Sequence, residues 1–322
     1  AFDFGGTVKD GGGPTRRIST RKEPVGVVGL VTPWNYPVAI PAWKLAPAIA
    51  TGNTAVIKPA SLAPGPAHAI VTALDEAGIP DGVVNLVTGP GSEVGDVFTT
   101  HSAIDAVSFT GSSATGQHVY DAATNDGKRI QTEMGGKNPT VVSRSADLET
   151  AADIVASGAF GVTGQACTAT SRAIVHEDQY EAFVDAVVER AEAIDIGPGL
   201  DGADMGPQVS PGELESTLEY IDIAHDEGAT LETGGGQPDI DDGYFVEPTV
   251  FAGVDSEMTI AQEEVFGPVL AVIPVSDYDE AVEVANGVEF GLVASIVTDD
   301  HTEASRFAGE VEAGVVKINE KT

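Results

Sequence analysis

Short apolar runs alternate with helix-like stretches from residue 25 to about residue 116, and this alternation is the strongest constraint on the fold. Such spacing is typical of a parallel β-sheet covered by helices on both faces. The apolar runs, which we interpret as strands, cover residues 25–31, 54–58, 83–87 and 106–110. The predicted helices cover residues 37–50 and 64–77, with further helices beginning near Ser92 and after Gly111.

A second series of the same kind predicts another α/β unit. Its predicted strands cover residues 139–142, 245–250, 269–273 and 292–297. Its predicted helices cover residues 148–158, 179–193 and 214–227, and the polar, glycine-rich stretch 197–212 is predicted to be a surface loop. The first 20 residues are polar and glycine-rich, which favours an arm or hairpin. We therefore expect an arm at 1–20, one α/β domain at 21–136 and a second at 137–322.

The chain carries 50 acidic and 16 basic residues, a net charge of −34. Such a surface repels nucleic acid and anionic membranes. The acids are dispersed along the chain, which favours adaptation to high salt, where screening removes their mutual repulsion. No apolar stretch is long enough to span a bilayer, and no signal peptide is evident. We expect a cytoplasmic protein whose fold depends on salt; because residue 1 is not methionine, we also expect a fragment of a longer chain.

Cys167, the one cysteine, lies in the glycine-flanked run Gly164–Thr168. A single thiol excludes an internal disulfide. Cysteine thiolates are strong nucleophiles, so Cys167 is a candidate catalytic residue. The alternative is a small buried apolar residue without chemistry. The six histidines lack the spacing of metal ligands, so no metal site is predicted.

Several polar residues follow the predicted strands of the first domain. Asn35 lies in a proline-framed turn after the first strand, where an amide donor could bind an oxyanion. Lys58 ends the second strand and could contact ribose or phosphate oxygens, or could be a solvated lysine. Gly111 and Ser112 open a helix whose amides suit a pyrophosphate.

Two further motifs carry carboxylates. Glu133 precedes the pair Gly135-Gly136 and could act as a base, or could be an ordinary turn acid. Glu264 and Phe266 lie in a run that ends Gly267-Pro268, where the alternative is a turn with a core phenylalanine.

Together these segments resemble the NAD(P)+-dependent aldehyde dehydrogenase superfamily. The resemblance runs from about Arg21 to Asn319. The matching runs are residues 33–37, 109–112, 133–137, 164–167 and 264–268. It implies an α/β fold with a Rossmann-type cofactor domain at 21–136, a catalytic α/β domain at 137–322 and a partial oligomerisation arm at 1–20.

The resemblance also implies roles for the residues. Cys167 would be the nucleophile, Asn35 with the backbone amide of Cys167 the oxyanion hole, and Glu133 the general base. The implied cofactor contacts are Thr32, Pro33, Trp34, Lys58, Ser61, Gly111, Ser112, Glu264 and Phe266. The implied reaction oxidises an aldehyde to a carboxylic acid through a cysteine thiohemiacetal and thioester, with NAD or NADP as the hydride acceptor.

The chain departs from the family pattern in two ways. Ser61 stands where a glutamate commonly contacts the adenosine ribose, so repulsion of a 2′-phosphate is removed and NADP should be tolerated or preferred. About a hundred residues of the usual start are missing, and the end stops before the strand that completes the oligomerisation element. We expect the full-length protein to form a homodimer or homotetramer.

Substrate is suggested by a narrower resemblance. Residues 167–172 and 314–322 are similar to the 2,5-dioxovalerate (α-ketoglutarate semialdehyde) dehydrogenases within the family. Tyr36, Trp43 and Lys321 are implied to line the aldehyde channel, where Lys321 could attract a carboxylate. Lys321 could equally be a solvated lysine. Succinate semialdehyde or broad aliphatic aldehydes remain alternatives. From other classes, a cofactor-independent cysteine esterase, a CoA-acylating enzyme or a non-catalytic protein is also open.

Overall fold

The computed structural model describes residues 5–13 and 15–322 and divides the chain into two compact units, 1–134 and 135–322. The division falls two residues before the expected boundary at 136. Residues 1–4 and 14 of the expected arm lie outside the described residues. Within the arm, β1 (Val8–Asp10) and β2 (Arg17–Ser19) pair antiparallel as an exposed hairpin.

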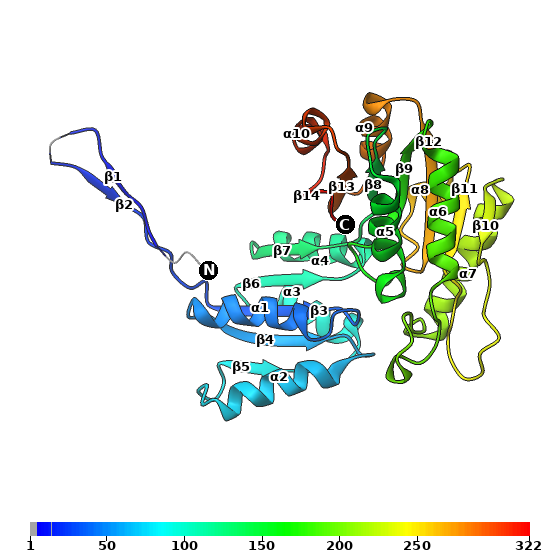
Figure 1. Ribbon diagram of the computed structural model, residues 1–322. Coiled ribbons are helices and arrows are strands. Elements are labelled where there is room, and N and C mark those ends of the chain that lie inside the picture. The colour runs from blue at the N-terminus through cyan, green and yellow to red at the C-terminus, as the bar shows by residue number, and fades with distance from the viewer. Residues whose placement is uncertain (1–4, 14) are drawn as a thin grey trace. The chain divides into compact units, whose positions relative to one another are not determined.

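The first unit is built on a parallel sheet in the order β5-β4-β3-β6-β7 (Figure 1). Its strands are β3 (Val27–Thr32), β4 (Thr54–Pro59), β5 (Val84–Leu86), β6 (Ala106–Thr110) and β7 (Arg129–Glu133). Its helices are α1 (Ala39–Ala50), α2 (Pro64–Glu76), α3 (Asp96–Thr100), preceded by a π-turn at Gly91–Gly95, and α4 (Ser113–Asn125). The alternating strands and helices predicted for this part of the chain therefore form a parallel sheet, as expected.

Alternate residues of β3 serve opposite faces of this sheet, because successive side chains of a strand point in opposite directions. Val28 and Leu30 pack in one apolar cluster with Leu45 of α1. Val27 and Val31 pack against a second cluster that contains Phe98 of α3. Two covered faces explain why the strand reads as a continuous apolar run.

The second unit contains a sheet in the order β10-β11-β12-β9-β8-β13-β14, parallel except for the β10–β11 pair (Figure 1). Its strands are β8 (Asn138–Val142), β9 (Thr170–His176), β10 (Thr230–Thr233), β11 (Thr249–Ala252), β12 (Val269–Val275), β13 (Val293–Val297) and β14 (Val315–Ile318). Its helices are α5 (Leu148–Phe160), α6 (Tyr180–Glu192), α7 (Pro211–Asp226), α8 (Thr259–Gln262), α9 (Tyr278–Asn286) and α10 (His301–Glu310), with 3₁₀ turns at Gly161–Gly164 and Gly199–Asp201.

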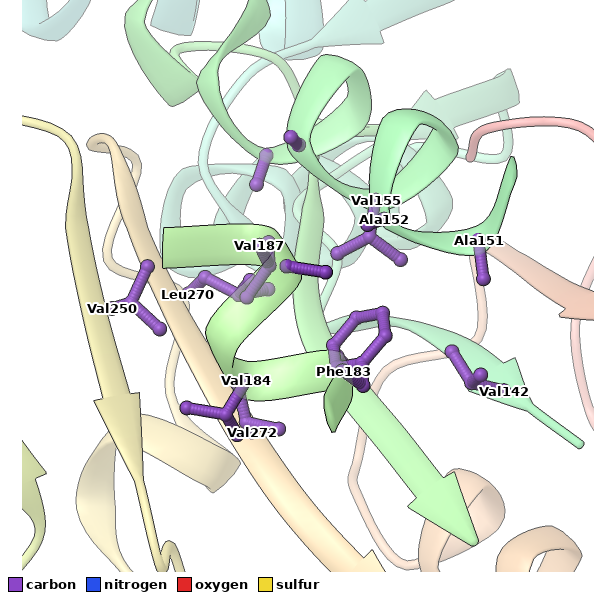
Figure 2. Close-up of a cluster of buried hydrophobic side chains, with 14 of the residues drawn as sticks. Val142, Ala151, Ala152, Val155, Phe183, Val184, Val187, Val250, Leu270 and Val272 are labelled. Atoms are coloured by element: carbon purple, nitrogen blue, oxygen red, sulfur yellow. The ribbon is translucent and has the colours of Figure 1, made fainter. Parts of the chain in front are cut away.

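The largest apolar cluster of the second unit lies between the sheet and the helices α5 and α6 (Figure 2). Phe183 of α6 is fully buried there, among valines and alanines such as Val142 and Val155. Small side chains on α5 let the helix approach the strands closely. Burial of a phenylalanine side chain stabilises the unit by about 1.5–3 kcal/mol.

The expected elements differ from the structure in a few places. The strand expected at 245–250 lies at 249–252, because Pro248 has no N–H for the ladder. Helix α7 begins at Pro211 rather than residue 214, with Ser210 accepting from the Glu213 N–H as its cap. The ranges of strands β7, β9, β10 and β14 and of helices α8, α9 and α10 were not predicted.

Candidate functional site

The expected residues of the first unit gather at the carboxyl edge of its parallel sheet, the edge where ligands of open α/β sheets bind. Lys58 is the penultimate residue of β4 and pairs with Val31 of β3. Glu133 ends β7, opposite Thr110 at the end of β6. Asn35 follows the end of β3, and Gly111 and Ser112 follow β6.

Asn35 is held by a local contact. Its Oδ1 accepts a hydrogen bond from the backbone N–H of Tyr36 at 3.0 Å. Because the amide oxygen faces this N–H, the NH₂ end of the carboxamide points the other way. This is the donor end that binding of an oxyanion requires.

Lys58 is 5% exposed, so the interpretation of a solvated lysine is wrong. Its Nζ donates to the carbonyl of Pro59 at 3.0 Å and to that of Gly89 at 3.3 Å. The hydroxyl of Ser61 donates to the same Gly89 carbonyl at 3.4 Å. Burial lowers the pKa of Lys58. The ammonium is therefore fixed at the sheet edge by two carbonyl oxygens, and it has a third N–H.

Two observations at this edge fit a nicotinamide dinucleotide. Thr32 ends β3 next to Pro33 and Trp34, and its buried hydroxyl has no hydrogen-bond partner among the described residues. Ser112 precedes α4, but its side chain accepts no hydrogen bond from the backbone amides of the first turn. Its hydroxyl donates to Thr115 Oγ1 at 3.0 Å. An uncapped helix start and an unpartnered hydroxyl are both open to an oxygen-rich ligand such as a pyrophosphate-linked ribose.

Lys44 of α1, which the sequence analysis missed, is linked to Glu133. Its Nζ donates to Ser108 Oγ at 2.6 Å, and Ser108 donates to Gln131 Oε1. Gln131 Nε2 in turn donates to Glu133 Oε1 at 2.8 Å. Burial lowers the pKa of Lys44 to about 8, and the charge of Glu133 partly opposes that shift. The signal in the sequence was one lysine in the otherwise apolar run 39–50.

Trp43, the neighbour of Lys44, is 71% exposed. Tyr36 is half-buried. The channel role of Tyr36 and Trp43 stays a prediction.

In the second unit, the residues that precede Cys167 have a strained backbone conformation. Val162, Thr163 and Gly164 have φ angles of 55°, 59° and 66°. This left-handed region is unfavourable for β-branched residues. At Gly164 a Cβ atom would also come within 2.1 Å of the Gly267 carbonyl oxygen, so only glycine fits. Cys167 itself is partly buried, neither sealed in the core nor fully exposed.

The side chains of residues 163 and 165 hold the segment before Cys167 in place. Thr163 Oγ1 donates to the Gly206 carbonyl at 3.0 Å. Gln165 donates to the Pro207 carbonyl at 3.3 Å and accepts from the Val209 N–H at 2.9 Å. The polar loop expected at 197–212 thus supports the cysteine-bearing segment.

Glu264 contacts both glycines that follow Met134 and explains the first of them. Its Oε1 accepts from the Gly136 N–H at 3.0 Å, and a Cβ on Gly135 would lie 2.1 Å from its Oε2. Burial raises the pKa of Glu264, while the Gly136 N–H and Lys137 oppose this. Phe266 has a positive φ of 58°, a strained conformation for an aromatic residue.

Lys321 is exposed and donates to Ser157 Oγ of α5 at 3.2 Å. A groove at this point is lined by apolar and charged side chains, including Phe160, Met205 and Arg190. Arg190 already pairs with Asp153 at 2.9 Å and with Glu149. Lys321 contacts a neutral hydroxyl, and the groove lining also includes the acidic residues Asp153 and Asp204.

The described residues contain no group of three or more His, Cys, Asp or Glu side chains that could hold a metal ion. In the same residues, no helix combines the length and the apolar character that crossing a bilayer requires.

The first unit has a Rossmann-type parallel sheet, and the second α/β unit carries Cys167 on a turn. These features together place the chain in the class of two-domain α/β oxidoreductases. The chain belongs to the aldehyde dehydrogenase family, whose model matches residues 3–322. It is 66% identical to an α-ketoglutarate semialdehyde dehydrogenase of the halophile Haloferax volcanii, over 100% of this chain and 67% of the relative. It is 48% identical to a 2,5-dioxopentanoate dehydrogenase of Saccharolobus solfataricus, over 100% of this chain and 68% of that relative.

Solved structures of aldehyde dehydrogenases are also similar to this chain. A betaine aldehyde dehydrogenase of Staphylococcus aureus in complex with NAD+ superposes with a TM-score of 0.95 at 41% identity, covering 99% of this chain and 64% of that one. The chain thus spans about two thirds of the length of the relatives that it matches. The expected α/β fold of the family is confirmed.

Proposed function

We propose that this protein oxidises an aldehyde to a carboxylic acid with NAD(P)+. The observation that carries the proposal is the backbone conformation before Cys167. Val162 and Thr163 have unfavourable positive φ angles there, and a hydrogen bond from Thr163 holds the segment in place. The chain that contains this segment belongs to the aldehyde dehydrogenase family. Cys167 is the proposed nucleophile, Asn35 and the Cys167 N–H the proposed oxyanion donors, and Glu133 the proposed base.

These residues have complementary chemistry. Addition of the Cys167 thiolate to the aldehyde carbon creates an oxyanion, and each preorganised donor stabilises such a charge by about 3–4 kcal/mol. When bound, the nicotinamide cofactor supplies the hydride acceptor that converts the thiohemiacetal to a thioester. Glu133 then removes a proton from the water that attacks the thioester carbonyl, which releases the acid and restores the thiol.

We propose that Thr32, Lys58, Ser112, Glu264 and their neighbours hold the cofactor, with Pro33, Trp34 and Gly111 shaping the edge and Phe266 against the nicotinamide ribose. Ser61 places no carboxylate beside Lys58, so a 2′-phosphate meets an ammonium and a hydroxyl. NADP should therefore be accepted at least as well as NAD. Initial rates at saturating aldehyde with each cofactor test this, and a strong preference for NAD would contradict it.

We propose 2,5-dioxovalerate, the semialdehyde of α-ketoglutarate, as the substrate. Relatives at 66% and 48% identity are named for this reaction. Lys321 offers an ammonium to the carboxylate end of the substrate, and Tyr36 and Trp43 are proposed as channel residues. A panel of semialdehydes and uncharged aldehydes tests the proposal. We expect the dioxovalerate to give the highest kcat/KM, and equal values for an uncharged aldehyde of the same length would overturn the substrate assignment.

Lys321→Met should raise KM for the carboxylate-bearing aldehyde about fivefold, because an exposed charge contact contributes on the order of 1 kcal/mol. KM for an uncharged aldehyde should change little. The matched control is Lys317→Met, which removes a lysine four residues away that lies near Glu320. If both variants raise KM alike, Lys321 acts only through the net charge.

We further propose that the hairpin of β1 and β2 is an oligomerisation arm. Val8 and Ile18 are 71% and 57% exposed on it, and exposed apolar side chains on a hairpin suit burial against a second copy. Light scattering should show a homodimer or homotetramer that shifts to a smaller species when the hairpin is deleted.

A cytoplasmic location is proposed on the single thiol and the acidic surface.

A further inference from the structure

Asn138, the first residue of β8, makes contacts that the proposed roles do not use. It is 2% exposed. Its Nδ2 donates to the carbonyl oxygens of Cys167 and Ala169, each at 2.8 Å, and its Oδ1 accepts from the Val293 N–H at 3.4 Å. One buried carboxamide thus connects β8, the segment that carries Cys167 and the start of β13.

Cys167 is a central residue of a tight turn. The Ala169 N–H donates to the Ala166 carbonyl at 2.9 Å, which closes a turn over residues 166–169. That bond uses neither the Cys167 nor the Ala169 carbonyl, and buried carbonyls require donors. Asn138 donates to both. The orientation of the peptide plane after Cys167 is therefore set by a side chain outside the turn.

The backbone around Asn138 is shaped for this contact. A Cβ on Gly136 would lie 2.6 Å from Asn138 Oδ1 and 2.7 Å from the Cys167 carbonyl oxygen, so a larger residue would displace the pair. The β8–β9 register also shifts, from Asn138 opposite Thr170 to Pro139 opposite Arg172. A bulge of this kind re-aims the chain beside a functional site.

We propose that Asn138 is a positioning residue for Cys167. The inference rests on the proposed function, in which Cys167 is the nucleophile. The carboxamide holds the peptide that follows the thiol, so it fixes the direction of the Cα–Cβ bond. It also donates to two carbonyl oxygens whose partial negative charges would otherwise disfavour a nearby thiolate.

The test uses the fact that Cys167 is the one thiol of the chain, so alkylation by iodoacetamide reports on it alone. In Asn138→Ala, we expect kcat to fall on the order of 10- to 100-fold while KM for the cofactor changes less than about threefold. The pH at which the alkylation rate is half-maximal should rise by about half a unit or more. Asn138→Ser keeps a donor and should recover part of both effects.

Gln179 provides a matched control in the same unit. Its Nε2 donates to the carbonyls of Ser143, Arg144 and Ala146, at the opposite end of β8. Gln179→Ala removes a similar carboxamide and should leave kcat and the alkylation profile unchanged, whatever it does to the melting temperature.

A purely structural role for Asn138 predicts a different outcome. If Asn138→Ala and Asn138→Ser lower the melting temperature but alkylate with the wild-type pH profile, the proposal is overturned. If Asn138→Ala does not fold, a wild-type profile in Asn138→Ser overturns it equally. Failure of the proposed function is separate, because it would appear as full turnover by Cys167→Ala while the alkylation profile still reports on the carboxamide.

Discussion

Lys44 lies buried on the otherwise apolar helix α1, and its ammonium reaches Glu133 through Ser108 and Gln131. These four side chains come from α1, β6 and β7, so no local pattern could predict that they meet. The same holds for Asn138, whose partners Cys167 and Val293 are 29 and 155 residues away in sequence. Cys167 and Asn35, in contrast, belong to compact motifs and were identifiable before the structure.

The buried lysine predicts how stability depends on pH. Burial lowers the pKa of Lys44 from 10.5 to about 8, so between these values the unfolded chain binds more protons than the folded one. The free energy of unfolding should therefore rise with pH from about 8 to about 10.5. Lys44→Met should remove part of this rise, on the order of 3 kcal/mol, and stabilise the protein at neutral pH.

Denaturant unfolding at pH 7, 9 and 10.5 measures this slope. Lys9→Met, in the exposed hairpin, is the control and should keep the wild-type slope. A Lys44→Met slope equal to that of wild type would show that the lysine titrates alike in both states.

At the scale of elements, patterns of apolar residues predicted most strands and helices of the first unit, but in the second unit they missed β9. This central strand begins with the polar residues Thr170, Ser171 and Arg172, which leaves an apolar run of only residues 173–175. The guanidinium is satisfied by the carbonyls of Lys137, Val284 and Ala285 at 2.8–3.0 Å. Two of these acceptors lie at the carboxyl end of α9, where a cation is favourable, and only the assembled unit provides them.

The turn that leads to Cys167 carries strain that can be relieved. Val162 is 51% exposed with a φ of 55°, and a β-branched residue there costs about 1–3 kcal/mol. Val162→Asn should raise the free energy of unfolding by about 1 kcal/mol, since asparagine tolerates this conformation.

Val315→Asn is the comparison, because Val315 is 50% exposed in the extended strand β14. Asparagine is disfavoured in strands, so this variant should be less stable than wild type. Equal losses of stability in both variants, measured by denaturant unfolding, would mean that the Val162 backbone is not strained.

At the scale of the whole molecule, the net charge of −34 dominates. Self-repulsion destabilises a compact acidic chain, and salt screens it within about 10 Å at 0.1 M ionic strength. We expect the melting temperature to rise by several degrees or more from dilute buffer to molar KCl. The triple variant Asp239→Asn, Asp241→Asn, Asp242→Asn removes three exposed acids and should flatten that rise. A melting temperature independent of KCl would contradict the account.

The central claim is that Cys167 carries the acyl group during turnover, and mass spectrometry of the quenched protein tests it most directly. In Glu133→Gln, which lacks the proposed base for hydrolysis, aldehyde plus NADP+ should give about one equivalent of reduced cofactor per site and an acyl adduct on the Cys167 peptide. Turnover by Cys167→Ala at the wild-type rate, or an adduct on another residue, would contradict the account.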